Sequence, residues 1–136
     1  MRHRHPDADR HAHGEARTRA ALIWLSETEE AQVITYGMLH ERVERAAAGA
    51  RRCALQALSA LRDALGSLDR VVGIAQLSVF VASAPGFTKQ PAVGNGASEL
   101  LVELLGDAGR HARIAVGVQE LPLGAAVEVA VVAVID

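Results

Sequence analysis

The spacing of apolar positions changes several times along the chain, and each change predicts a different element. Apolar runs at residues 20–25 and 33–39, separated by the polar segment 26–30, predict a β-hairpin. Over residues 40–65, apolar side chains recur every three or four positions, which is typical of one face of a helix, and Gly66 follows as a stop signal. The first half of the chain therefore predicts two strands and one long helix.

The second half of the chain alternates strands with one more helix. Residues 69–82 are rich in β-branched side chains and predict a strand, which a Pro-Gly turn follows. A helix is expected from residue 90 or 93 to residue 105, and two further strands over residues 112–119 and 125–135. This order predicts an α+β fold, in which a mixed β-sheet has two helices packed on one face.

A sheet that is covered by helices on one face leaves its other face exposed. If that face is apolar, it must be covered by another subunit, and the valine-rich stretch at 127–134 indicates that it is apolar. We therefore expect the protein to form an oligomer.

The first 19 residues differ in composition from everything that follows. They contain four histidines, five arginines and three acidic residues, and they lack Leu, Ile, Val and aromatic residues. Such a segment cannot bury enough apolar surface to offset its ordering entropy, so we expect a disordered tail at 1–19 and a single domain at 20–136. The alternative for the tail is a weak metal-binding tract, because a His-x-His pattern occurs at residues 3–5 and 11–13.

Composition and charge exclude several classes of protein. Aromatic residues make up 3% of the chain and the net charge is −2, which argues against a nucleic-acid partner. A single cysteine rules out an internal disulfide and a multi-cysteine zinc site. The apolar run at 129–135 is much shorter than the roughly 20 residues that span a membrane, and no apolar leader opens the chain. We expect a soluble cytoplasmic protein with no membrane partner.

Two charged residues interrupt the apolar pattern of the C-terminal strands, namely Arg113 and Glu128. On a pleated strand Arg113 shares one face with Ala115 and Gly117, whose small side chains leave space around the guanidinium. A charge in such surroundings must meet an anion, which is either Glu128 or the carboxylate of a ligand. The pattern alone favours the internal pair with Glu128 and leaves the ligand site open.

Other polar residues give weaker indications. His111 could act as a general base, although a histidine in a turn or an interface is the more frequent case. The serines at 78, 83 and 98 lack a recognisable base and orienting acid in the sequence, so nucleophilic catalysis is not expected.

Residues 70–135 resemble the YjgF/RidA family of enamine/imine deaminases. The segments that carry the resemblance are VFV at 79–81, APGF at 84–87, VGNGA at 93–97, GRHARIAVGV at 109–118 and LPLGAAVEV at 121–129. The resemblance implies a chorismate-mutase-like (ferredoxin-like) fold, assembled as a barrel-like homotrimer with pockets between subunits.

The resemblance also implies an activity, the hydrolytic deamination of reactive 2-imino or enamino acids to 2-oxo acids and ammonia in metabolite-damage control. In this interpretation Arg113 binds the substrate carboxylate and Glu128 is catalytic and positions water. Asn95, Tyr36 and Gly37 stand at substrate-binding positions, and no metal or organic cofactor is required.

The chain departs from the family pattern in its N-terminal third. Tyr36 stands where many members have a serine, Met38 replaces a glutamine, and Ala115 occupies a position that is often cysteine. These departures favour an alternative from a different class, a non-catalytic trimeric protein that binds small carboxylate metabolites. Both hypotheses stay open on the sequence.

Overall fold

The computed structural model describes residues 14, 17, 20–25 and 31–136, so most of the predicted tail lies outside the described residues. It divides the chain into two compact units, Met1–Arg45 and Ala46–Asp136. Each unit is described by itself below.

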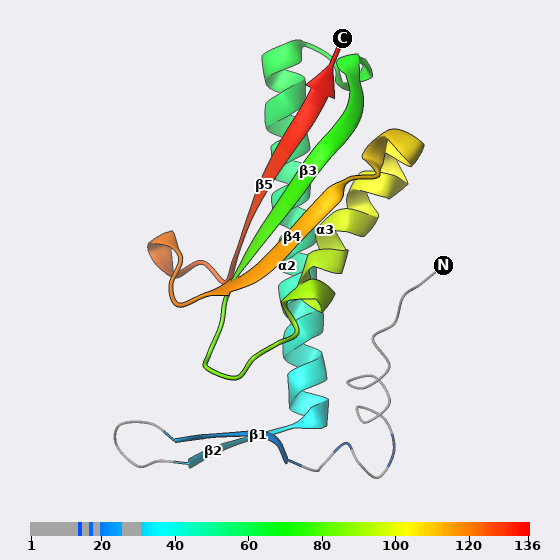
Figure 1. Ribbon diagram of the computed structural model, residues 1–136. Helices are drawn as coiled ribbons and strands as arrows, with labels where there is room; N and C mark the ends of the chain where they lie inside the picture. Colours follow the sequence, from blue (N-terminus) through cyan, green and yellow to red (C-terminus); the bar gives the residue numbers. More distant parts are fainter. Residues whose placement is uncertain (1–13, 15–16, 18–19, 26–30) are drawn as a thin grey trace. The chain divides into compact units, whose positions relative to one another are not determined.

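The first unit contains a β-hairpin. Strands β1 (Ala20–Leu25) and β2 (Ala31–Thr35) pair antiparallel, with Ile23 opposite Val33 (Figure 1). The predicted hairpin is confirmed, and it forms a two-stranded sheet of its own.

The predicted second strand at 33–39 is wrong in its C-terminal half, because helix α2 (Tyr36–Leu65) already begins at Tyr36. The hydroxyl of Thr35 accepts a hydrogen bond of 3.2 Å from the backbone N–H of Met38. This bond satisfies one of the free N–H groups of a first helical turn, and it therefore starts the helix four residues earlier than the apolar spacing predicts. At the other end the helix stops as predicted, with Gly66 at a φ of +82°.

The second unit contains a three-stranded mixed sheet with the order β4-β3-β5 (Figure 1). The central strand β3 (Val71–Ala82) pairs parallel with β4 (Ala112–Val118) and antiparallel with β5 (Val127–Ile135). The three strands lie within the segments that the sequence predicts for them. The α+β fold class and the mixed sheet are confirmed.

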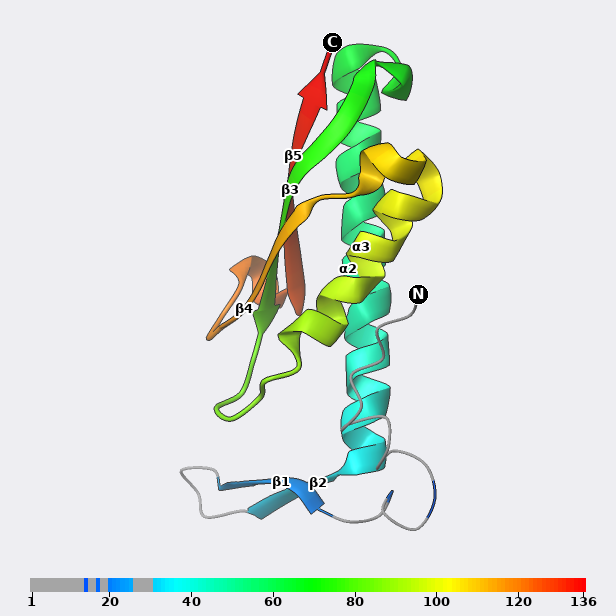
Figure 2. The ribbon, with the colours of Figure 1, turned by 45° about the vertical axis from the view of Figure 1, so that its right-hand side comes forward.

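Both helices of this unit lie on the same side of the sheet, as Figure 2 shows for α3 (Gln90–Leu105) and the part of α2 from residue 46 onward. The thiol of Cys53 on α2 lies 3.8 Å from the carbonyl oxygen of Val127, which places this helix over β5. The helices approach closely at Gly96, where any Cβ atom would collide with the backbone carbonyl of Ala47. Within the described part of the chain, no helix has the length and apolar character needed to cross a membrane.

Short 3₁₀ turns join these elements. They are η2 (Leu68–Arg70) before β3, η3 (Gly106–Gly109) between α3 and β4, and η4 (Pro122–Gly124) between β4 and β5. The turn η3 packs against α3 at Gly109, where a Cβ atom would collide with the carbonyl of Leu101.

The core of the second unit lies between the sheet and the two helices. The largest fully buried side chains come from the sheet and from both helices: Leu58, Leu77, Val79, Val93 and Leu101. The opposite face of the sheet, which we call the outer face, exposes large apolar side chains: Ile114 48%, Val116 40%, Val132 56% and Val134 48%. An apolar outer face is therefore confirmed, and no described residue of the second unit covers it.

Candidate functional site

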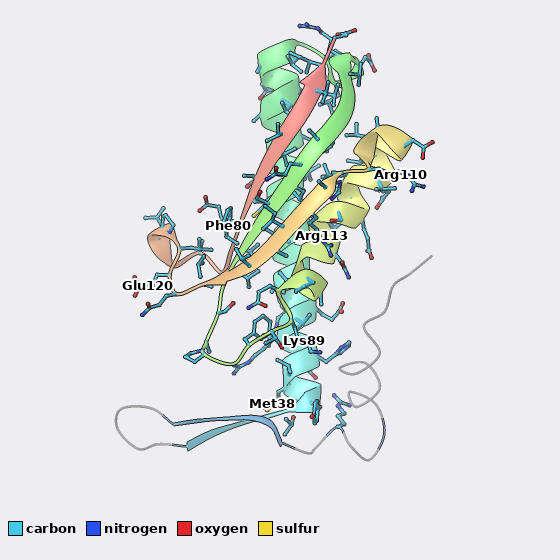
Figure 3. All side chains as sticks on the ribbon, viewed as in Figure 1. Met38, Phe80, Lys89, Arg110, Arg113 and Glu120 are labelled. Carbon is cyan, nitrogen blue, oxygen red and sulfur yellow. The ribbon has the colours of Figure 1, made fainter. Side chains whose placement is uncertain are left out.

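Arg113 projects from β4 toward the helices. Its strand partner on β3 is Leu77, which is completely buried, so Arg113 lies on the helix-covered face of the sheet. Figure 3 labels its side chain on the sheet. The Nη1 atom of Arg113 donates hydrogen bonds to Oδ1 of Asn95, at 2.8 Å, and to Oγ of Ser98, at 3.2 Å. Arg113 and Asn95 were both predicted as binding residues, and the structure brings them together.

The sequence of α3 explains why these two acceptors meet one nitrogen atom. Asn95 and Ser98 are three residues apart, and residues at this spacing lie on the same side of a helix. Helix α3 and β4 lie close together at Gly94, where an added Cβ atom would be in van der Waals contact with Cβ of Ala115, at 3.6 Å, and with Cδ of Arg113, at 3.7 Å. The small residues therefore let the helix come near enough to hold the guanidinium.

One edge of the guanidinium is left for a ligand. Both N–H groups of Nη1 are used on α3, whereas Nε and Nη2 have no partner among the described residues. The described part of the chain also offers Arg113 no carboxylate within ion-pair distance, and the residue is exposed. The edge formed by Nε and Nη2 has two parallel N–H donors, which is the geometry that binds a carboxylate with two hydrogen bonds.

Glu128 lies on the outer face of the same sheet. It is exposed and pairs with Phe80 on β3, three residues from the partner of Arg113. Positions an odd number apart on a strand point to opposite faces, so Glu128 and Arg113 point away from each other across the sheet. The internal Arg113–Glu128 pair that the pattern favoured is therefore wrong for a single chain.

Two further hydrogen bonds link Ser98, a partner of Arg113, to His111 and link His111 to the backbone of Gly109. Oγ of Ser98 lies 3.0 Å from Nε2 of His111, and Nδ1 of the same ring lies 2.6 Å from the carbonyl oxygen of Gly109. The sequence shows no base near Ser98 and favours a turn or interface role for His111. The signal that was missed is the spacing of these residues, since Ser98 follows Asn95 by three residues on α3, and His111 stands directly before β4, two residues before Arg113.

Tyr36 and Gly37, the other predicted binding residues, lie in the first turn of α2 and belong to the first unit. Gly37 is buried, and a Cβ atom there would lie 2.6 Å from Cγ of Arg17. This contact gives Gly37 a packing role, and the binding role of both residues stays a prediction.

No group of three His, Cys, Asp or Glu side chains in the described part of the chain is arranged to hold a metal ion. The paired histidines of the N-terminal tail lie outside the described residues.

Three comparisons place the chain among known proteins. Residues 31–135 match the family model described as "YjgF/chorismate mutase-like, putative endoribonuclease". Among solved structures, the chain is similar to the protein Atu1372 with unknown function from Agrobacterium tumefaciens, at 37% identity and a TM-score of 0.68, over 85% of this chain and 68% of that one. It is also similar to a putative endoribonuclease from Shewanella oneidensis, at 32% identity and a TM-score of 0.65, over 67% of this chain and 60% of that one.

A curated relative, Protein TCP17 of Trypanosoma cruzi, is 58% identical over 83 residues, which are 60% of this chain and 52% of that protein. The chain thus spans about half the length of this curated relative. The family model covers most of the chain, and two solved structures share its fold. The chain belongs to the YjgF/chorismate mutase-like family, as the sequence resemblance predicted.

Proposed function

We propose that the protein is a cytoplasmic homotrimer that hydrolyses reactive 2-imino or enamino acids, with Arg113 as the anchor for the substrate carboxylate. The observation that carries this proposal is the guanidinium edge formed by Nε and Nη2, which faces no acceptor among the described residues. A guanidinium held from one side by neutral oxygens keeps its full charge for an anion on the other side.

In the proposed reaction water adds to the carbon of the protonated imine while Glu128 accepts a proton from that water. Glu128 then returns this proton to the nitrogen of the carbinolamine, the C–N bond breaks, and the hydroxyl group loses its proton to solvent, which yields a 2-oxo acid and ammonia. An enamine first takes a proton on carbon to become the imine. A positioned carboxylate is sufficient for these proton transfers, and the proposal requires no metal or organic cofactor.

Two copies of the chain are needed to assemble this site. Arg113 and Glu128 lie on opposite faces of one sheet, so an approach within one chain is excluded. Glu128 stands on the exposed apolar outer face, which it shares with Val132, and it lies across β3 from Val116. This face is where a second copy would bury the most apolar surface. The proposal therefore requires a homotrimer in which Glu128 of one chain approaches Arg113 of its neighbour.

The test is the release of 2-oxo acid and ammonia from 2-aminoacrylate or 2-iminobutyrate that a second enzyme generates in the assay. We expect Arg113→Ala to lower kcat/KM by about 100-fold, because it removes two hydrogen bonds to a charged carboxylate. The matched control is Arg110→Ala, which removes an arginine three residues away whose side chain is 77% exposed and pairs with Asp107. If the wild type and Arg113→Ala accelerate the release equally little, the proposed catalysis is wrong.

A second candidate is a non-catalytic trimer that binds small carboxylate metabolites. The same geometry favours it, because a single chain holds the guanidinium of Arg113 in place for a carboxylate and keeps Glu128 on the opposite face of the sheet. Thermal denaturation with a series of 2-oxo acids separates the two candidates. Stabilisation that depends on Arg113, without turnover, supports the binding protein, whereas the absence of any response to carboxylates contradicts both.

The description of the Shewanella oneidensis protein as a putative endoribonuclease belongs to that protein. In this chain the net charge of −2 and the 3% of aromatic residues give no support to an RNA substrate. We therefore propose an imine, and not RNA, as the substrate.

A further inference from the structure

We propose that His111 is a positioning residue, which acts through Ser98 to hold the guanidinium of Arg113 with its Nε/Nη2 edge turned toward the ligand. This inference rests on the proposed function for the identity of the ligand. The directions of the hydrogen bonds that link Gly109, His111, Ser98 and Arg113 do not depend on the identity of the ligand.

The carbonyl of Gly109 determines the tautomer of His111. A carbonyl oxygen can only accept, so Nδ1 at 2.6 Å must carry the proton and donate it. In the neutral ring Nε2 then has no proton and accepts. The backbone of η3 therefore makes the side of His111 that faces Ser98 an acceptor.

The tautomer in turn determines the direction of the bonds at Ser98. Its hydroxyl lies 3.0 Å from Nε2 of His111 and donates its single proton there. The lone pairs of Oγ are then directed away from the ring, and one of them accepts from Nη1 of Arg113, at 3.2 Å. Without an acceptor at position 111, a serine inside a helix turns its hydroxyl toward the carbonyl four residues earlier, which here is that of Gly94.

The result at Arg113 is a fixed orientation. The guanidinium is planar, and Nη1 is held at two points by Asn95 and Ser98. Fixing both N–H groups of one nitrogen fixes the plane and thus the direction of the remaining Nε/Nη2 edge. A pre-oriented fork loses less entropy when it binds a carboxylate than a mobile one does.

The first experiment needs no ligand. Nitrogen NMR of the histidine rings, with the His111 signal assigned from its disappearance in His111→Gln, reports which ring nitrogen carries the proton. We expect the tautomer protonated at Nδ1. The tautomer protonated at Nε2 would overturn the inference, because Ser98 would then be an acceptor from the ring.

The second experiment measures the affinity for pyruvate, used as a simple 2-oxo acid, by calorimetry. We expect His111→Leu and Ser98→Ala each to weaken binding by about fivefold, the effect of losing one hydrogen bond. His111→Gln keeps an acceptor oxygen for Ser98 and Ser98→Thr keeps the hydroxyl, so both should bind nearly as the wild type does. His40→Leu, which removes a histidine of the first unit, is the matched control. In the deaminase assay the same variants should raise KM and leave kcat unchanged.

The outcomes separate this inference from the proposed function. If the wild type and Arg113→Ala bind pyruvate equally, the proposed carboxylate anchor is wrong. If binding depends on Arg113 but both His111→Leu and Ser98→Ala bind as the wild type does, the inference is wrong and the anchor stands. Should His111→Leu fail to fold, Ser98→Ala interrupts the same chain of bonds and decides the question.

Discussion

The two faces of the three-stranded sheet differ in how much of their packing and hydrogen bonding a single chain provides. On the helix-covered face, Leu77 and Val79 are fully buried, and the charged residue there, Arg113, is held by the two hydrogen bonds that it donates to α3. On the outer face, Val132 and Val134 are about half exposed, and Glu128 is exposed without an ion-pair partner among the described residues.

This difference assigns separate roles to the two faces. The helix-covered face has its packing and its polar bonds satisfied internally, so it stabilises the chain and presents one binding group in a fixed orientation. The outer face has apolar area without cover, and its contribution to stability and to catalysis depends on another copy.

The largest expected effect tests the contribution of the helix-covered face to folding. Leu77→Ala should lower the free energy of unfolding by about 2–5 kcal/mol, because it leaves a cavity in a closely packed core. Val134→Ala, at a position 48% exposed on the outer face, should cost less than about 1 kcal/mol in the separated chain. Urea denaturation under dissociating conditions measures both values. Equal losses would contradict the difference between the two faces.

The second prediction concerns Glu128 and the reaction. Glu128→Gln keeps the shape of the side chain and removes its capacity to accept a proton, so kcat should fall by about 100-fold. KM should stay within about threefold of the wild type, because the carboxylate anchor Arg113 is intact. Steady-state kinetics with an enzymatically supplied imine measure both constants.

The matched control for this prediction is Glu120→Gln, which changes an exposed glutamate in the connection between β4 and β5 (Figure 3). It should leave both constants unchanged. A normal kcat in Glu128→Gln would remove Glu128 from the proposed mechanism and would favour the binding protein.

The smallest expected effect concerns assembly. Val132→Glu places a charge on the outer face and should weaken subunit association by about tenfold or more, because a buried unpaired charge is costly. Leu104→Glu changes a side chain of similar exposure, 52%, on α3 and should leave the assembly intact. Light scattering over a dilution series gives the oligomeric state. If both variants remain assembled, the outer face is not the interface between copies.

The sequence predicts most of the fold, because its elements follow from local spacing. The helix over residues 40–65, the strand at 69–82 and the two C-terminal strands all agree with the structure to within a few residues. The error at 33–39 also has a local cause. Apolar spacing cannot show that a Thr35 hydroxyl caps a helix, and the cap moves the start of α2 to Tyr36.

The candidate site could be predicted in part. Arg113 stands out because a charge interrupts an apolar strand, and the family resemblance adds Asn95, which the structure places 2.8 Å from it. Ser98 and His111 were missed as partners because they come from different elements. The spacing along each segment places Ser98 near Asn95 and His111 near Arg113. The contact between Ser98 and His111 depends on how η3 packs against α3, which spacing along the chain does not determine.

The sequence by itself determined the identity and order of the elements of this protein, the amphipathic character of its sheet and the family to which it belongs. These properties depend on spacing along the chain, which short-range sterics and side-chain period convert directly into local structure. Only the tertiary structure decided that Arg113 and Glu128 lie on opposite faces and that His111 stands behind Ser98. The physical reason is that a strand changes face with every residue, so the relation between side chains on different strands depends on register, which is established when the sheet and helices pack together.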